Sequence, residues 1–92
     1  MIKLSQKAYN DYRNNVNGSQ DVSFEYAEML LNRNIILGDH FKNKGYDRVY
    51  YGCLMMIIKD NTIIHIKNRT SHKGKPSTLA KKILNELMGI GK

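Results

Sequence analysis

Tryptophan is absent from this chain of 92 residues, and cysteine and proline each occur only once. A single cysteine cannot form an internal disulfide, so the sequence is not a disulfide-stabilised scaffold, and we expect it in a reducing compartment, the cytoplasm. Acidic residues are also few, because 8 Asp and Glu stand against 15 Lys and Arg, which gives a net charge of +7. This excess favours RNA or another polyanion as a partner.

Long hydrophobic runs are missing as well. The longest strongly apolar run, from Cys53 to Ile58, is far shorter than the ~20 residues that cross a membrane, so we expect no membrane partner. The N-terminal segment has no apolar block and no small-residue cleavage site, so no signal peptide is predicted. An apolar content of 41% suffices for one modest core, which predicts a single domain over residues 1–92.

Hydrophobic periodicity predicts two helices in the first third of the chain. The first begins after Ser5, a candidate N-cap, and should end at residues 17–19 (Asn-Gly-Ser). Its apolar stripe comprises Leu4, Ala8, Tyr12 and Val16. The second begins near Ser23 and should stop at Asn34. Residues 35–37 (Ile-Ile-Leu) are then predicted as a short strand, and the polar residues 38–45 as a loop.

The middle of the chain predicts three more strands in meander order. Tyr46–Tyr51 alternates, Gly52 marks a turn or bulge, and Cys53–Lys59 is almost continuously apolar. Asp60-Asn61 is a two-residue hairpin signal, because both residue types tolerate positive φ. It predicts an antiparallel partner strand over Thr62–Lys67.

A basic loop over residues 69–76 leads to a last helix that Ser77 should cap. Its apolar stripe comprises Leu79, Ile83 and Leu87, with Ala80 and Leu84 beside it. The predicted fold is therefore α+β, with two N-terminal helices, a four-stranded, mainly antiparallel sheet (a meander) and one C-terminal helix. The helices should cover one face of the sheet.

Strand alternation sorts the side chains onto two faces. We expect Ile64 and Ile66 to pack against helices that carry Leu30, Ile83 and Leu87. The opposite face and its rim should collect rings and cations, namely Tyr46, Arg48, Tyr50, Lys59, His65, Lys67, Arg69, His72, Lys73 and Lys75. Cations attract phosphates and bases stack on rings, so this pattern is typical of a nucleic-acid surface. An open antiparallel sheet also needs a solvated face, and Lys and Arg serve that purpose equally well.

His65 interrupts an apolar strand, which makes it a candidate general acid or base. With cations nearby it would activate a ribose 2′-hydroxyl while they stabilise phosphate charge. The predicted catalytic residues are His65, Arg48 and Tyr50. The predicted nucleic-acid contacts are Arg48, Lys59, Lys67, Arg69, Lys73 and Lys75. The alternative is that His65 forms an inert cross-strand pair with Tyr50.

Neither a metal nor another cofactor is expected. The histidines and Cys53 show no zinc-ligand spacing such as CxxC or HExxH, and the glycine between Lys73 and Lys75 lacks the phosphate-loop pattern. Cys53 begins an apolar run and suits a small core residue.

The order of these signals from Leu4 to Ile66 resembles RelE-like and colicin-D-like domains of the barnase–EndoU–colicin–RelE ribonuclease superfold. The segment over residues 22–28 (VSFEYAE) and the meander over residues 46–68 (YDRVYYGCLMMIIKDNTIIHIKN) carry the resemblance. It implies a ribonuclease-like fold and metal-independent RNA cleavage. The histidine that such domains carry on helix one would fall at Lys7, before Ala8.

Three hypotheses follow. The first is a small basic RelE-like RNA-binding protein, with a metal-independent ribonuclease toxin as its catalytic form and an antitoxin as its protein partner. The second is a phage or mobile-element protein that binds and inhibits a host defence or nucleic-acid enzyme without catalysis. The small size permits this, as does a composition in which Lys, Asn and Ile supply 31 of 92 residues, the usage expected of an AT-rich genome. The third is a homodimeric interaction module, since a short domain has a thin core and exposed strand edges.

Overall fold

A computed structural model describes residues 1–16, 20–73 and 78–90, with residues 70–73 and 78 described by their backbone alone. The elements in chain order are β1 (Lys3–Leu4), α1 (Gln6–Asn15), α2 (Phe24–Leu37), β2 (Asp39–Asn43), β3 (Tyr46–Lys59), β4 (Thr62–Lys73) and α3 (Thr78–Met88). The predicted helix end at residues 17–19 and the predicted cap Ser77 lie outside the described residues. The α+β class and the three helices are confirmed.

The sheet is mixed, which corrects the prediction of a mainly antiparallel meander. Its strand order is β1-β4-β3-β2, and the short N-terminal strand β1 runs parallel to β4. Strand β3 pairs antiparallel with β2 on one side and with β4 on the other. Strand β1 was not predicted, because two residues are too few for a periodicity signal.

The predicted N-cap Ser5 and the predicted start of the second helix near Ser23 are confirmed. The Ser5 hydroxyl accepts a hydrogen bond from the Ala8 amide at the start of α1, and the Ser23 hydroxyl accepts one from the Tyr26 amide at the start of α2. Helix α1 buries Ala8 and Tyr12 of the predicted stripe.

Residues 35–37 belong to the last turn of α2, so the predicted strand there and the predicted helix end at Asn34 were wrong. Ile35 continues the stripe of Ala27 and Leu31 into the core, and its burial outweighs the preference of β-branched residues for strands. The helix ends at Leu37, and the amide of the C-cap residue Gly38 donates to the Asn34 carbonyl.

Residues 38–45 do not form the predicted loop. Asp39–Asn43 forms the edge strand β2, and a turn at Gly45, with φ +89°, leads into β3. An edge strand tolerates polar side chains on both faces, and for that reason its sequence resembles a loop.

Strand β3 is continuous through Gly52, where a positive φ of 57° and a register shift form the bulge that the sequence predicted. The hairpin turn at Asp60 and Asn61 is also confirmed, with φ angles of 52° and 60°. Strand β4 runs on to Lys73, so the predicted loop that begins at residue 69 was wrong.

A second register shift lies between Ile57 and Ile58 and changes which β4 side chains are buried. Ile58 pairs with Ile63, whereas Ile57 pairs with His65. Ile63 and Ile66 therefore both point into the core, and Ile64 is 36% exposed. The prediction that Ile64 packs against the helices was wrong, because one extra residue in a strand reverses the alternation beyond it.

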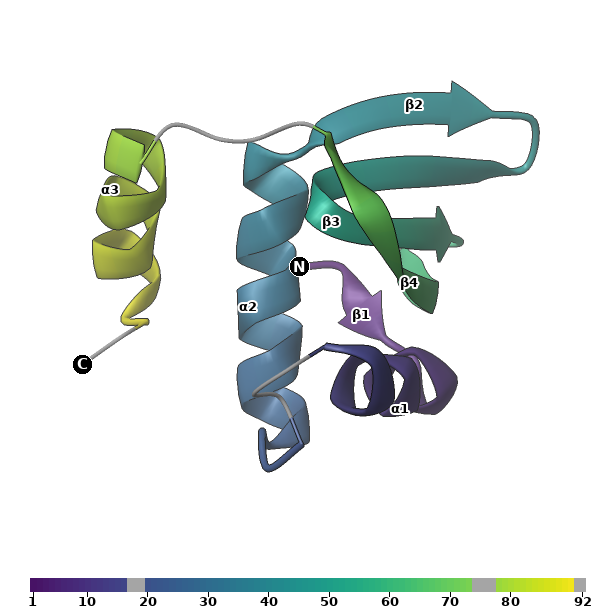
Figure 1. Cartoon of the computed structure of the whole chain (residues 1–92). Coiled ribbons are helices and arrows are strands. Elements are labelled where there is room, and N and C mark those ends of the chain that lie inside the picture. Colours follow the sequence, from purple (N-terminus) through teal and green to yellow (C-terminus); the bar gives the residue numbers. More distant parts are fainter. Residues whose placement is uncertain (17–19, 74–77, 91–92) are drawn as a thin grey trace.

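Helix α2 lies between the sheet and α3, and α1 lies along the edge of β4 (Figure 1). The core forms where α2 meets one face of the sheet, with Leu31, Val49, Met56, Ile63 and Ile66 as its largest fully buried side chains. The apolar stripe of α3 lies outside this core: Leu79, Ile83 and Leu87 are 66%, 50% and 79% exposed. Their predicted burial was wrong, because α3 packs mainly on α2 and Leu84 is only half-buried. Among the described helices, none is long and apolar enough to cross a membrane.

Candidate nucleic-acid interface on the open sheet face

The face of the sheet that points away from α2 is called the open face here. Cross-strand pairs define it, since Phe41 pairs with Arg48, Met55 with Lys67, and Ile57 with His65. Its side chains are half-buried or exposed: Phe41, Tyr46, Arg48, Tyr50, Met55, Ile57, Ile64, His65, Lys67 and Arg69. The predicted collection of rings and cations on one face is therefore present, with more aliphatic surface than expected.

Two arginines and two rings form a cluster at the β2 end of this face. The Arg69 guanidinium carbon lies 4.3 Å from the centre of the Tyr50 ring, and that of Arg48 lies 6.0 Å from it. The Phe41 ring meets Tyr50 edge to face, with 5.4 Å between the ring centres. This Tyr50 cluster holds both guanidinium groups beside aromatic surface.

Within the part of the chain that the structure describes, neither arginine of the Tyr50 cluster forms an ion pair, and neither Nε has a hydrogen-bond partner. Arg69 donates one hydrogen bond, from Nη2 to the Gly52 carbonyl at 3.4 Å. Asp39 of β2 pairs with Tyr50, so a carboxylate also belongs to this face of the sheet. Both guanidinium groups can therefore take an anionic ligand.

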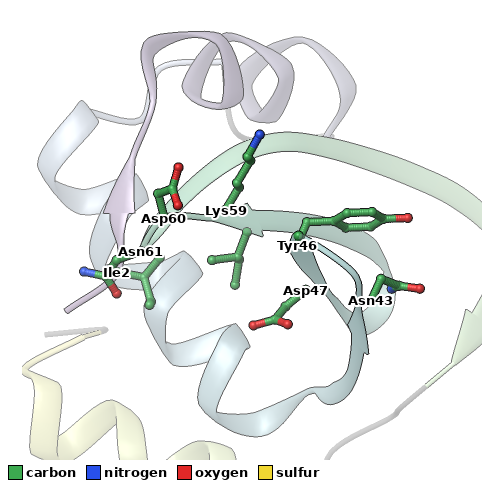
Figure 2. A pocket seen from close by; sticks show the side chains of 9 residues that line it. Ile2, Asn43, Tyr46, Asp47, Lys59, Asp60 and Asn61 are labelled. Atoms are coloured by element: carbon green, nitrogen blue, oxygen red, sulfur yellow. The ribbon is translucent and has the colours of Figure 1, made fainter.

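An apolar depression on the open face lies beside the turn between β2 and β3. This cavity of about 320 Å³ is lined by Tyr46, Ile57 and Ile64, with Lys44 and Lys59 among its walls. One ring and two lysines thus border the same cavity. On the other side of Tyr46 is a cavity of about 390 Å³, where the Asp47 and Asp60 carboxylates lie while the Lys59 amino group and the Tyr46 phenol extend outward (Figure 2). These carboxylates make the second cavity unsuitable for a phosphate.

His65 lies where α1 meets the edge of β4. Strand β1 pairs with β4 only as far as Ile63, and α1 then supplies acceptors to the unpaired edge. The Ile66 amide donates to Asp11 Oδ2 at 3.3 Å, and the Asn68 amide side chain donates to the Asn15 carbonyl at 2.9 Å. A cavity of about 480 Å³ opens at this junction and includes Lys67 in its wall.

Lys7, Asp11 and His65 form one hydrogen-bonded group, called the His65 cluster here. Lys7 Nζ lies 2.8 Å from Asp11 Oδ2 and 2.8 Å from His65 Nδ1, and Nδ1 lies 3.4 Å from Asp11 Oδ2. A protonated lysine can only donate, so Nδ1 is the acceptor and the neutral ring carries its proton on Nε2. Burial acts to raise the pKa of Asp11, but the hydrogen bonds from Lys7 and the Ile66 amide, with the positive charge of Lys7, lower it below 3.8.

The structure brings Arg48, Tyr50 and Arg69 together but separates them from His65. His65 pairs with Ile57, on the other side of the Gly52 bulge from Tyr50, so the alternative pairing of His65 with Tyr50 was wrong. Lys67 neighbours His65, and Lys59 is exposed beside the hairpin turn. The side chains of His72 and Lys73, and all of Lys75, lie outside the described residues. The predicted catalytic set of His65, Arg48 and Tyr50 thus does not share one site.

Sequence reasoning missed Phe41, Lys7 and Asp11 as site residues. Phe41 lay in a segment predicted as a loop. The Lys7 and Asp11 pair at i and i+4 was a usable signal for a charged helix face, although nothing in the sequence placed it beside His65. Within the described ranges there is no group of three or more His, Cys, Asp or Glu side chains that would hold a metal ion.

The family model of YorE matches residues 2–89, so the chain belongs to the YorE family. No curated protein and no solved structure matches the sequence significantly. The resemblance to RelE-like and colicin-D-like domains stays a prediction.

Proposed function

We propose that this member of the YorE family binds single-stranded RNA on the open face of its sheet. The observation that carries the proposal is the Tyr50 cluster, where two guanidinium groups that form no ion pair with any described residue lie against aromatic rings. The net charge of +7 supports it, because phosphate neutralisation supplies most of the affinity of non-specific nucleic-acid binding.

The geometry of the Tyr50 cluster favours unpaired bases over a duplex. Arg69 covers the Tyr50 ring, so a base would stack on the guanidinium plane of Arg69 or on the ring of Phe41, which is 40% exposed. Such stacking needs a base free of its own neighbours, as in a single strand. The depression at Tyr46, with Lys44 and Lys59, offers a second stacking position on the same face.

Fluorescence anisotropy with a labelled single-stranded RNA, and with its duplex, tests this proposal. Phe41→Ala should weaken single-strand binding roughly 5- to 150-fold, because one base–aromatic stack contributes about 1–3 kcal/mol. Tyr26→Ala is a matched control, since Tyr26 is 39% exposed and lies on α2, away from the open face. Equal affinities of Phe41→Ala and the parent chain, or a preference for duplex, would contradict the proposal and direct attention to a protein target.

Metal-independent RNA cleavage is a second candidate function, favoured by the His65 cluster and its cavity of about 480 Å³. In the reaction His65 takes the proton of a ribose 2′-hydroxyl, whose oxygen bonds to the adjacent phosphorus; the bond from phosphorus to the 5′-oxygen breaks, and the 5′-oxygen takes a proton from water. In the arrangement described above, Nε2 carries a proton and Nδ1 is held by Lys7. His65 must therefore lose the contact with Lys7, or change tautomer, before it can act as a base.

Incubation of labelled total RNA with and without EDTA tests the second candidate. His65→Ala should abolish most cleavage, since a general base contributes about 10²–10⁴-fold, and should leave RNA affinity nearly unchanged. His40→Ala is the matched control, because His40 contacts the Ile35 carbonyl and lies outside the cluster. Cleavage by His65→Ala at the parent rate would exclude this role for His65.

A further inference from the structure

Helix α3 carries more apolar side chains than α2 covers. Helix α2 half-buries Ala80, Leu84 and Met88, and Arg33 of α2 donates a hydrogen bond to the Asn85 side chain at 3.0 Å. The adjacent stripe of Leu79, Ile83 and Leu87 remains mostly exposed. Figure 1 shows α3 at the outside of the molecule, with α2 between it and the sheet. Exposed apolar surface of this extent on a helix indicates an interaction site.

We propose that the stripe of Leu79, Ile83 and Leu87, called the α3 stripe below, joins two copies of this chain in an antiparallel, two-fold symmetric dimer. The stripe is self-complementary in such an arrangement. Residues four apart lie on one helix face, and a two-fold axis near Ile83 places Leu79 of one copy opposite Leu87 of the other. Ile83 then packs on its own counterpart at the centre.

The charges beside the α3 stripe support this orientation. Lys82 and Glu86 are both exposed and follow the same flank of the helix, because they are four residues apart. In an antiparallel pair the same flank of both helices meets, so Lys82 of one copy faces Glu86 of the other. The two-fold axis repeats this contact, which gives two such charge pairs. A parallel pair about a two-fold axis would instead bring opposite flanks together, so Lys82 and Glu86 of one copy would not face those of the other. Charge complementarity thus selects the antiparallel dimer.

The dimer would cover the α3 stripe and leave the open sheet face accessible on each copy, because α2 lies between α3 and the sheet. The inference is independent of the proposed RNA binding.

Sedimentation velocity over a wide range of protein concentration tests the dimer. The parent chain should sediment as a species of twice 10.6 kDa and dissociate on dilution. Leu87→Glu should weaken association at least about tenfold, because it places a charge in an apolar contact. It should leave the monomer folded, since Leu87 is 79% exposed. Gln6→Glu is the matched control, as it adds the same charge to an exposed position of α1.

A charge exchange tests the orientation separately. Lys82→Glu and Glu86→Lys should each weaken the dimer by placing like charges opposite one another, and the double variant should restore the parent association. Circular dichroism checks that all variants keep their helices. A parent chain that stays monomeric at every concentration would overturn the proposal. Association that is insensitive to Leu87→Glu, or a double variant no better than the single ones, would do the same.

Discussion

Substitutions of Arg69 distinguish phosphate contact from base stacking most clearly. Its guanidinium carbon lies 4.3 Å from the Tyr50 ring centre, closer than that of Arg48 at 6.0 Å. Arg69→Gln removes both the charge and the guanidinium plane. Arg69→Lys keeps the charge but loses the planar group that stacks on rings and bases.

The salt dependence gives the magnitude. For single strands each neutralised phosphate contributes about −0.7 to the slope of log affinity against log salt concentration. If the described cations Arg48, Lys59, Lys67 and Arg69 each neutralise one phosphate, the slope is about −2.8, and a fourfold rise in salt weakens binding about 50-fold. Arg69→Gln should reduce the slope to about −2.1, so the same rise in salt weakens binding only about 20-fold.

The measurement is anisotropy with a single-stranded RNA at several salt concentrations. Arg69→Lys should keep the parent slope and bind more weakly at every salt concentration. Arg13→Gln, the charge-matched control, changes an exposed arginine of α1, which should leave the slope nearly unchanged. Equal slopes for Arg69→Gln and the parent chain would refute the assignment of Arg69 to a phosphate.

Three further predictions concern charge, protonation and packing. Asp39→Asn should tighten RNA binding, because it removes the carboxylate opposite Tyr50; weaker binding in anisotropy would contradict this. The Asp11 pKa is lowered in the folded state, so its stabilising contribution is present above the ordinary value near 3.8 and is lost as pH falls through the lowered value. Urea unfolding should therefore show a stability gap between the parent chain and Asp11→Asn that is full at pH 6 and narrows below about pH 4; a gap independent of pH would count against it. Gly38→Ala should destabilise the fold by about 1–3 kcal/mol in urea unfolding, since its Cβ would lie 2.5 Å from the Tyr50 carbonyl oxygen; unchanged stability would disprove that close approach.

The parts of the fold that the sequence predicted correctly depend on local chemistry. Ser5 and Ser23 cap helices because their hydroxyl groups accept nearby amides, and Asp60-Asn61 forms a turn because both residues adopt positive φ. Gly52 produced a bulge for a similar local reason. Such signals act over a few residues and do not require knowledge of the packing.

The errors arose where tertiary contacts decided the outcome. Ile35 stays helical because it enters the core, and the polar segment 39–43 becomes a strand because β3 offers it a partner. The register shift beside Ile57 leaves Ile64 exposed, and no residue type in β3 or β4 indicates that shift. The amphipathic pattern of α3 was real, but periodicity does not say which neighbour covers a face.

The candidate site was predicted in part for the same reasons. Alternation placed Arg48 and Tyr50 on one face correctly, because the two residues lie in one strand on one side of the bulge. The contact of Arg69 with Tyr50 and the group of Lys7, Asp11 and His65 depend on strand pairing and on where α1 lies. Neither could be derived from spacing along the chain.

The central claim is that single-stranded RNA binds at the open face around the Tyr50 cluster. An NMR titration of the isotope-labelled protein with an unlabelled single-stranded RNA tests it most directly. We expect the largest shifts at the Arg48 and Arg69 side-chain Nε–H resonances and the Phe41 ring, with smaller shifts near Tyr46 and little change on α2 and α3. No shifts at the Tyr50 cluster, or shifts confined to α3, would contradict the claim.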